Sequence, residues 1–265
     1  MRVGFVGAGR MGAPMVRRLV DAGHEIRVLG RTDEARQAVT ELGATAVAEL
    51  ADAAEQADVV VVCVFTDDQV KRVCFDDGLL AAMPSGSTLV LHTTGSPRTA
   101  EAIAAEAPHV AIVDAPVSGG PHDIAAGRIA LFVGGDDDAV AGVRPVLSAY
   151  GDPVLHVGPL GSGQKVKLIN NVLFAAQLGL LSEASRLATG LGVDESALLE
   201  AVAHGSGASR ALGLVANAGS VATFVSAVGE FIGKDVAVAR ATVAELGAEL
   251  GALDEVVSAG IRPEN

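Results

Sequence analysis

Short apolar runs alternate with amphipathic stretches from Arg2 to about Val157. The runs read RVGFV, EIRVL, VVVVCV, STLVLH, VAIVDA, IALFVG and PVLHV. Strands that alternate with helical segments of about 10 to 15 residues form βαβ units, with a parallel sheet and right-handed crossovers. The pattern therefore predicts a doubly wound α/β domain over residues 1–160.

The pattern changes near Gly158, where "GPLGSG" interrupts it. The segments that follow have helical periodicity and no strand signal, so we expect an all-helical domain over residues 161–265. The stretch from Gln164 to about Leu191 is apolar nearly all the way round. Such a helix is typically covered by other helices or by a partner subunit, which favours a homodimer or homotetramer over a monomer.

Composition narrows the classes of partner. Half of the residues are hydrophobic and 19% are charged, as in a folded globular protein. No apolar run reaches the roughly 18 residues that span a bilayer, and no signal-peptide region precedes the first strand, so we expect a cytoplasmic protein without a membrane partner. A net charge of −13, one tyrosine and no tryptophan argue against nucleic acid binding. Cys63 and Cys74 are expected to be unpaired buried thiols, and the absence of ligand spacing predicts no metal site.

A glycine-rich loop follows the first predicted strand. In a dinucleotide-binding unit the first glycine makes the tight turn, the second lets the backbone approach the pyrophosphate, and the third allows close packing of helix on strand. The following helix then directs free N–H groups at the phosphates. We therefore predict a Rossmann-type doubly wound, mostly parallel sheet followed by an all-α C-terminal domain. The expected cofactor contacts in the loop are Gly7, Ala8, Gly9, Arg10, Met11 and Gly12.

The end of the second strand indicates which dinucleotide is bound. An acidic residue there would accept a hydrogen bond from the adenosine 2′-hydroxyl of NAD and repel a 2′-phosphate. This chain has Arg31 and Thr32 instead. A guanidinium fork and a hydroxyl suit a phosphate, so we predict NADP in preference to NAD. We expect Asp33 to be the N-cap of the next helix, not a ribose ligand.

A second glycine pair occurs in "DAPVSGGPHDIAAG", residues 114–127. Gly119 and Gly120 can expose consecutive backbone N–H groups to an anion, and Ser118 adds a hydroxyl. The loop follows a strand at the sheet edge where open α/β sheets bind ligands. A merely flexible turn is the alternative interpretation.

Four motifs occur in order along nearly the whole chain. They are GAGRMGAPM at residues 7–15, DAPVSGG at 114–120, GxGxxxKxxNN from Gly161 to Asn171, and Lys234-Asp235. In this combination the sequence resembles the β-hydroxyacid dehydrogenases, which include 3-hydroxyisobutyrate dehydrogenase and tartronate semialdehyde or glyoxylate reductases. The resemblance implies hydride transfer between a nicotinamide and a small β-hydroxyacid, or its semialdehyde or keto form.

The resemblance also implies residue roles. Lys167 would be the catalytic lysine, whose ammonium stabilises negative charge on the reacting oxygen and shuttles its proton. Asn171 lies four residues later on the same helical face, whereas Lys165 falls on another face and is expected to be solvated. The substrate would be held by Ser118, Gly119, Gly120 and Asn171, with Lys234 beside the cleft. Further cofactor contacts would come from Val64, Phe65, Gln69 and Thr94.

Some positions depart from the family pattern. Where members often read DxST, this chain has "LHTTGSP", in which Thr94 keeps its register and the acidic residue is missing. Pro121, His122 and Asp123 follow SGG in place of small or apolar residues, either as pocket residues that change which acid fits or as ordinary loop residues. The sequence ends some tens of residues earlier than is usual, so we expect a shortened last helix.

Two other functions are compatible with the fold. An imine reductase would reduce C=N, but a cationic Lys167 would repel a protonated iminium. A non-catalytic NADP-binding interaction module would have no need of Lys167, Asn171 and the SGG loop. The identity of the acid, the direction of the reaction and the choice between dimer and tetramer stay open at this level. Ser209 or Arg210 is a candidate to reach a second polar group of the substrate, with a surface arginine as the alternative.

Overall fold

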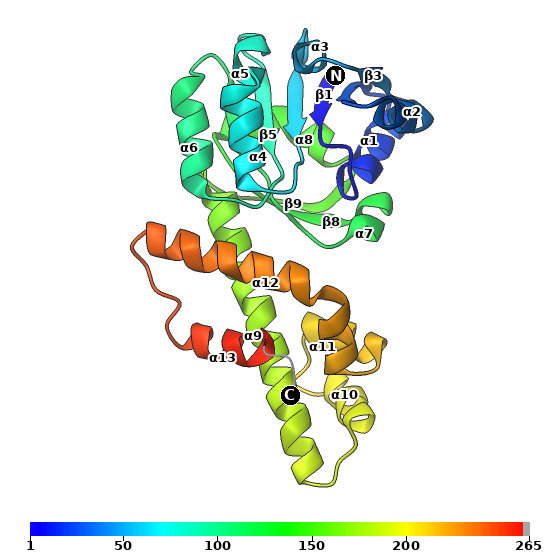
Figure 1. Ribbon diagram of the computed structural model, residues 1–265, viewed down its shortest axis with the longest axis vertical. Helices are drawn as coiled ribbons and strands as arrows, with labels where there is room; N and C mark the ends of the chain where they lie inside the picture. The colour runs from blue at the N-terminus through cyan, green and yellow to red at the C-terminus, as the bar shows by residue number, and fades with distance from the viewer. Residues whose placement is uncertain (262–265) are drawn as a thin grey trace. The chain divides into compact units, whose positions relative to one another are not determined.

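The computed structural model describes residues 1–261, which form two compact units. The first unit covers Met1–Lys167 and the second begins at Leu168, inside a long helix that starts at Ser162. The first unit is Rossmann-like and the second is helical, so the predicted fold class is confirmed. Figure 1 shows the first unit in blue to green and the second in green to red.

Within residues 1–261, the sheet of the first unit has nine strands in the order β3-β2-β1-β4-β5-β6-β8-β7, and β9 pairs with β8. The strands β1 to β6 are mutually parallel, whereas β8 runs antiparallel to β6 and β7. Their bounds are β1 (Arg2–Val6), β2 (Glu25–Leu29), β3 (Thr45–Val47), β4 (Val59–Val62), β5 (Thr88–Leu91), β6 (Ala111–Asp114), β7 (Val117–Ser118), β8 (Ile129–Gly134) and β9 (Gly151–Gly158).

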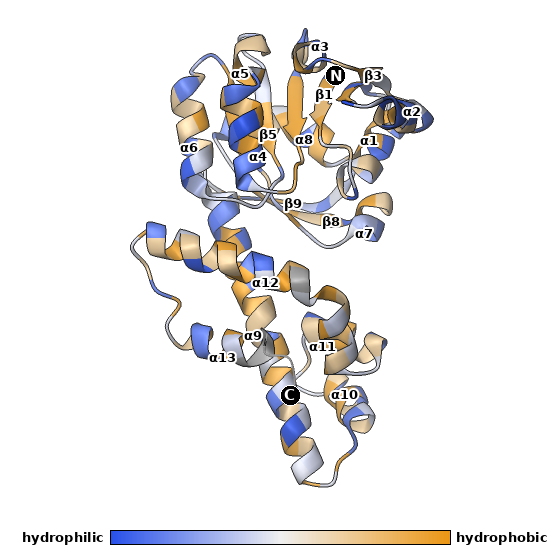
Figure 2. Cartoon of the chain, in the orientation of Figure 1, coloured by the Kyte–Doolittle hydropathy of each residue, from blue (hydrophilic) through white to orange (hydrophobic). Residues whose placement is uncertain are grey.

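Helices cover both faces of this sheet (Figure 1). In β4, Val59 and Val61 belong to the core under α1, α2, α7 and α8, while Val60 and Val62 belong to the core under α3 to α6. A strand buried on both faces reads as a continuous apolar run, which explains the VVVV sequence. Figure 2 shows the central strands such as β1 in orange and the outer helices α2 and α4 with much blue. The helices are α1 (Gly12–Asp21), α2 (Asp33–Glu41), α3 (Leu50–Ala54), α4 (Asp67–Lys71), the π-helix η1 (Arg72–Asp76), α5 (Leu79–Ala82), α6 (Pro97–Glu106), α7 (Pro121–Ala125) and α8 (Asp137–Leu147).

The sheet register brings three carboxyl ends to one edge. Phe5 of β1 is paired with Val28 of β2 on one side and with Val61 of β4 on the other. The chain leaves β1 between these two neighbours, so the strand order reverses at this point. In open α/β sheets such a switch point, outside the carboxyl ends of the strands, is where ligands bind.

The second unit is helical throughout its described residues, as predicted. One core joins α9, α12 and α13 through residues such as Val172, Val236 and Val257, and a second joins α9 to α10, α11 and α12 through residues such as Leu178, Leu199 and Val215. The helices are α9 (Ser162–Gly190), α10 (Glu195–Ala203), α11 (Arg210–Ala218), α12 (Val221–Glu245) and α13 (Ala252–Ile261).

Helix α9 is not buried all the way round. A set of its apolar side chains is between 45% and 71% exposed, which leaves them accessible on the single chain. These residues are Ile169, Leu173, Leu180 and Leu187 of α9, with Leu191 directly after it. No single helix among the described residues is long and apolar enough to cross a membrane, and the pair Arg210–Ala218 and Val221–Gly229 meets that test only together, with a 99° bend between them.

Two local predictions have definite outcomes. Thr32, not Asp33, is the N-cap of α2, because its Oγ1 accepts a hydrogen bond from the N–H of Ala35 at 3.2 Å and Asp33 is the first helical residue. Both cysteines are free as predicted, and burial raises the pKa of each thiol to about 12, so both stay protonated at neutral pH.

Candidate active site

The three loop glycines meet three different steric demands. Gly7 has a φ of +102°, and a Cβ there would lie 2.3 Å from the carbonyl oxygen of Cys63. A Cβ on Gly12 would lie 2.1 Å from the carbonyl oxygen of Gly7, so the third glycine brings α1 against the end of β1. A Cβ on Gly9 would meet nothing within 4 Å, which leaves open space beside its backbone. These are the roles expected of a phosphate-binding loop.

The start of α1 also leaves its first N–H groups uncapped by a side chain. The N-cap is Met11, which makes no side-chain cap hydrogen bond, and no acidic residue lies in the first turn. The positive end of the helix dipole is therefore not neutralised locally. An anion beside this turn would meet both the N–H groups and the dipole.

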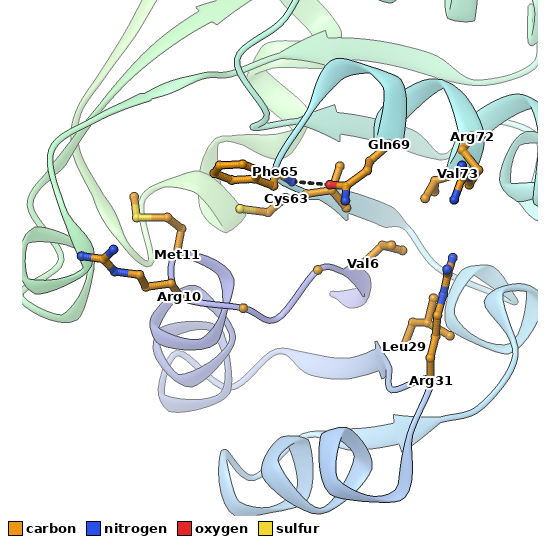
Figure 3. Close-up of a pocket in the computed structure, with 13 residues that line it drawn as sticks. Val6, Arg10, Met11, Leu29, Arg31, Cys63, Phe65, Gln69, Arg72 and Val73 are labelled. Carbon is orange, nitrogen blue, oxygen red and sulfur yellow. Dashed lines mark hydrogen bonds between the residues drawn. The ribbon is translucent and has the colours of Figure 1, made fainter. Parts of the chain in front are cut away.

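A pocket of about 430 Å³ opens at this sheet edge (Figure 3). Its lining includes eight of the predicted cofactor contacts: Gly7, Gly9, Arg10, Met11, Arg31, Val64, Phe65 and Gln69. The predicted residues Ala8, Gly12, Thr32, Thr94 and Lys234 are not part of this lining. Five further residues that the sequence did not single out complete it: Val6, Leu29, Cys63, Arg72 and Val73.

The charge of this pocket differs from that of the chain. The described lining residues include Arg10, Arg31 and Arg72 and no aspartate or glutamate. The chain as a whole has 32 acidic residues and 19 lysines and arginines. A pocket that concentrates cations in an acidic protein attracts anionic ligands.

Side-chain hydrogen bonds hold the turn after β4 that forms one wall of the pocket. Gln69 Oε1 accepts from the N–H of Phe65 at 2.8 Å and of Thr66 at 3.2 Å, the first of which Figure 3 draws. Thr93 Oγ1 accepts from the N–H of Val64 at 3.0 Å and donates to its carbonyl oxygen at 2.9 Å. Gln69 thus fixes the backbone at Phe65, one of the predicted cofactor contacts. Thr93 connects this wall of the pocket to the segment that contains Thr94.

A buried carboxylate and an amide attach the first turn of α9 to the sheet. Asp114 accepts from the N–H of Gly161 and of Gln164, both at 2.7 Å. Gln164 in turn accepts from the N–H of Gly95 at 3.0 Å and donates to the carbonyl oxygen of Thr93 at 2.8 Å. Burial raises the pKa of Asp114, against the lowering effect of its backbone hydrogen bonds. The half-buried Lys167 follows three residues later on the same helix, whereas Lys165 is exposed as expected.

The SGG loop differs from the expectation that both glycine N–H groups are exposed. The N–H of Gly120 donates to Asp123 Oδ2 at 2.8 Å, because Asp123 stands in the first turn of α7 and folds back on the loop. Gly119 has a φ of +137°, and Ser118 is half-buried at the end of β7. The structure leaves the Ser118 hydroxyl and the Gly119 N–H as the remaining donors of the SGG triplet. His122 is 82% exposed and Asp123 only 17%, so the carboxylate, not the imidazole, belongs to the loop's interior.

Polar residues of the second unit form their own group. Asn171 is 7% exposed, and its Nδ2 donates to Asp235 Oδ2 at 3.0 Å. This bond fixes the orientation of the Asn171 amide. Within the described part of the chain, its Oδ1 accepts only a long hydrogen bond, from Asn170 Nδ2 at 3.5 Å, and so has room for a second donor. Burial lowers the pKa of Lys234, and the neighbouring Asp235 opposes this shift. Ser209 is the N-cap of α11, and its Oγ accepts from the N–H of Leu212 at 3.1 Å.

The comparisons with known proteins follow the division of the chain. Residues 2–158 match the NAD binding domain of 6-phosphogluconate dehydrogenase, and residues 161–259 match the family described as NAD-binding of NADP-dependent 3-hydroxyisobutyrate dehydrogenase. The chain belongs to the 3-hydroxyisobutyrate dehydrogenase family. It is an oxidoreductase with a nicotinamide-binding domain, as the glycine loop predicted.

Two relatives from Pseudomonas aeruginosa show how this family varies. An NAD-dependent L-serine dehydrogenase is 36% identical over 214 residues, which are 80% of this chain and 72% of that protein. A 3-hydroxyisobutyrate dehydrogenase is 34% identical over 215 residues, again 80% of this chain and 72% of that protein. The matched family model is described as NADP-dependent and the serine dehydrogenase as NAD-dependent, so family membership alone does not fix the cofactor.

Solved structures agree with the family. Mycobacterium tuberculosis 3-hydroxyisobutyrate dehydrogenase with L-serine superposes with a TM-score of 0.87 at 30% identity, over 97% of this chain and 91% of that one. An imine reductase from Streptomyces aurantiacus has a TM-score of 0.70 at 20% identity, a likeness of fold alone.

Among the described residues, no group of three or more histidine, cysteine, aspartate or glutamate side chains could hold a metal ion.

Proposed function

We propose that the protein is an NADP-dependent dehydrogenase that interconverts a small β-hydroxyacid and its semialdehyde or keto form. The observation that carries the cofactor choice is the pocket at the ends of β1, β2 and β4. It combines an open glycine loop with Arg31 just beyond β2 and, among its described lining residues, has no carboxylate. A 2′-phosphate would bind there, and a 2′-hydroxyl would find no carboxylate among the described lining residues.

The chain's own residues fit a bound NADP. The uncapped start of α1 and the space beside Gly9 suit the pyrophosphate, and Arg31 suits the 2′-phosphate. When bound, the nicotinamide supplies or accepts the hydride. Thr32 is less suited to the 2′-phosphate, because its Oγ1 accepts from the N–H of Ala35 and its hydroxyl is hydrogen-bonded to the Glu34 carboxylate.

The acid–base chemistry is assigned to Lys167. Its ammonium would hold the reacting oxygen, stabilise negative charge on it and move a proton at Nζ. Support comes from the Asp114 and Gln164 hydrogen bonds, which fix the first turn of the helix that carries Lys167. Asn171 would present its amide oxygen, Ser118 and Gly119 would donate to the substrate, and Lys234 would add a cation.

A kinetic experiment tests this proposal. We expect NADPH oxidation with at least one small aldehyde-acid or keto-acid, and a higher kcat/KM with NADPH than with NADH. Lys167→Ala should lower kcat by about 10²–10⁴ while NADPH affinity changes little. Lys165→Ala is the matched control, since Lys165 is exposed two residues earlier on the same helix. A loss of only a few-fold in Lys167→Ala would remove the lysine from the chemistry, and cofactor binding without turnover would favour a non-catalytic NADP-binding module.

We also propose a homo-oligomer, a dimer or a tetramer, in the reducing cytoplasm. The exposed apolar side chains of α9 support a second copy of the chain as their cover, since contiguous exposed apolar surface marks interaction sites. The two free thiols support a reducing compartment. Light scattering of the purified protein tests the first point, and a monomeric mass at micromolar concentration would exclude it.

A further inference from the structure

A second arginine faces the one that the sequence predicted. Arg72 is the first residue of η1, and it lines the same pocket as Arg31. In Figure 3 the two guanidinium groups point toward one another, Arg31 from beyond the end of β2 and Arg72 from η1. Like charges placed in this way repel each other, so the arrangement is most stable with an anion between them.

The two arginines differ in their partners. Arg31 Nη2 lies 2.6 Å from Asp77 Oδ2 in an ion pair. Over residues 1–261 the exposed Arg72 side chain has neither a hydrogen bond nor an ion pair. Its guanidinium donors are therefore available to a ligand in the pocket.

Asp77 links both arginines to one turn of backbone. Its carboxylate pairs with Arg31, and its N–H donates to the carbonyl oxygen of Arg72 at 2.8 Å, closing the wide turn of η1. Single π-helical turns within helices are frequent at functional sites. The chain changes from α4 to η1 at Arg72, the residue that lines the pocket.

The ligand chemistry follows from the donors. A phosphate monoester carries between one and two negative charges near neutral pH and three strong acceptor oxygens, so it can accept from two guanidinium groups at once. We propose that Arg72 and Arg31 together bind the adenosine 2′-phosphate of NADP, and that Arg72 sets the preference for NADP over NAD. This inference rests on the proposed function, which assigns the pocket to the dinucleotide. Asp77 acts as a positioning residue that holds Arg31 toward the same point.

Binding of four ligands tests the role of Arg72. NADPH differs from NADH, and 2′,5′-ADP from 5′-AMP, by the same 2′-phosphate, and calorimetric titration gives each Kd. We expect Arg72→Ala to weaken NADPH and 2′,5′-ADP by about tenfold or more, as for loss of a charge-assisted hydrogen bond. NADH and 5′-AMP should be unaffected, and Arg72→Lys should restore part of the loss because it keeps the charge without the fork.

Lys71→Ala is the matched control. Lys71 is the adjacent cation, but its Nζ pairs with Asp67 Oδ2 at 2.9 Å and it does not line the pocket. An equal weakening by Lys71→Ala would mean that only the general positive field matters, which overturns the inference. Equal losses of affinity for NADPH and NADH in Arg72→Ala would mean that Arg72 contacts a part common to both, such as the adenine, and would overturn the inference as well. Unchanged affinity for both cofactors would also overturn it.

The same titrations separate this inference from the proposed function. If the wild-type protein binds NADH as tightly as NADPH, the proposed cofactor preference fails, and with it the role of Arg72 in setting that preference. If the wild-type protein prefers NADPH and Arg72→Ala keeps the full preference, only the role of Arg72 fails. Circular dichroism verifies that each variant is folded. If Arg72→Ala does not fold, the same titrations are carried out on Arg72→Lys.

Discussion

Acidification is expected to destabilise the first unit through one buried histidine. His92 is 3% exposed, with Nδ1 2.6 Å from the carbonyl oxygen of Ala115 and Nε2 2.8 Å from the hydroxyl of Tyr150. A carbonyl only accepts, so Nδ1 carries the hydrogen and Nε2 accepts from the tyrosine. The ring is neutral in this arrangement, and burial lowers the pKa of His92 from 6.5 to about 4.

The magnitude follows from the two pKa values. A group whose pKa is lowered on folding binds more protons in the unfolded state, so its contribution is complete above 6.5 and is lost as the pH falls toward 4. At about 1.4 kcal/mol per pH unit of difference, the loss approaches about 3 kcal/mol. This is a large part of the 5–15 kcal/mol that stabilises a typical domain.

The single tyrosine makes the measurement specific. The chain has one tyrosine and no tryptophan, so intrinsic emission reports on Tyr150 in the first unit alone. Urea unfolding followed by this emission, at several pH values between about 4 and 7, gives the free energy of unfolding at each pH. We expect it to fall steadily over that interval.

The control is His92→Gln, which cannot take up a proton in this range. Asp114, whose pKa is raised by burial, changes stability in the opposite sense in both proteins, so only the difference between them reports on His92. The wild-type protein should lose about 3 kcal/mol more than His92→Gln between neutral pH and about pH 4. Parallel pH profiles for the two proteins would refute the assignment of a neutral, buried imidazole.

Two further predictions concern positions that anchor the site. Gly12→Ala should destabilise the fold by about 1–3 kcal/mol in a thermal melt, since its Cβ would collide with the carbonyl oxygen of Gly7. Gly9→Ala should have the melting temperature of the wild-type protein but bind NADPH more weakly, because a Cβ there meets only open space. Equal melting temperatures for the two variants would contradict the steric reasoning. Gln164→Ala should leave the N–H of Gly95 and the carbonyl oxygen of Thr93 unpaired, which should lower the free energy of unfolding by about 1–3 kcal/mol. The variant should also lower kcat more than it changes the Kd of NADPH. Unchanged stability and kcat would exclude a positioning role for Gln164.

Much of the fold could be predicted because its signals are local. Strands such as β4 are short apolar runs, and the helices of the second unit show regular periodicity. The strands β3 and β7 were missed because three and two residues are too few to show an alternation. The antiparallel β8 follows from the path of the chain through the SGG loop and α7, which no local pattern encodes.

The site could be predicted only where a motif dictates it. The glycine loop and Arg31 lie at fixed distances from the first two strands, so spacing alone located them. Arg72 was missed because the change from α4 to the wider turn of η1 has no periodic signature. Asp114 and Gln164 were quoted only as parts of motifs, because their hydrogen bonds join segments that are 47 to 71 residues apart.

If the SGG loop holds the substrate as we propose, the bond between Gly120 and Asp123 bears on how the substrate range can change. The N–H of Gly120 is already committed to the protein itself, so an acid held in the proposed way would be recognised by the N–H of Gly119 and otherwise by hydroxyl, amide and ammonium side chains. Side chains are replaced by point mutation, whereas a peptide N–H stays in place whatever residue carries it. Selectivity built in this way is open to redesign one codon at a time, beginning with the codon for Asp123.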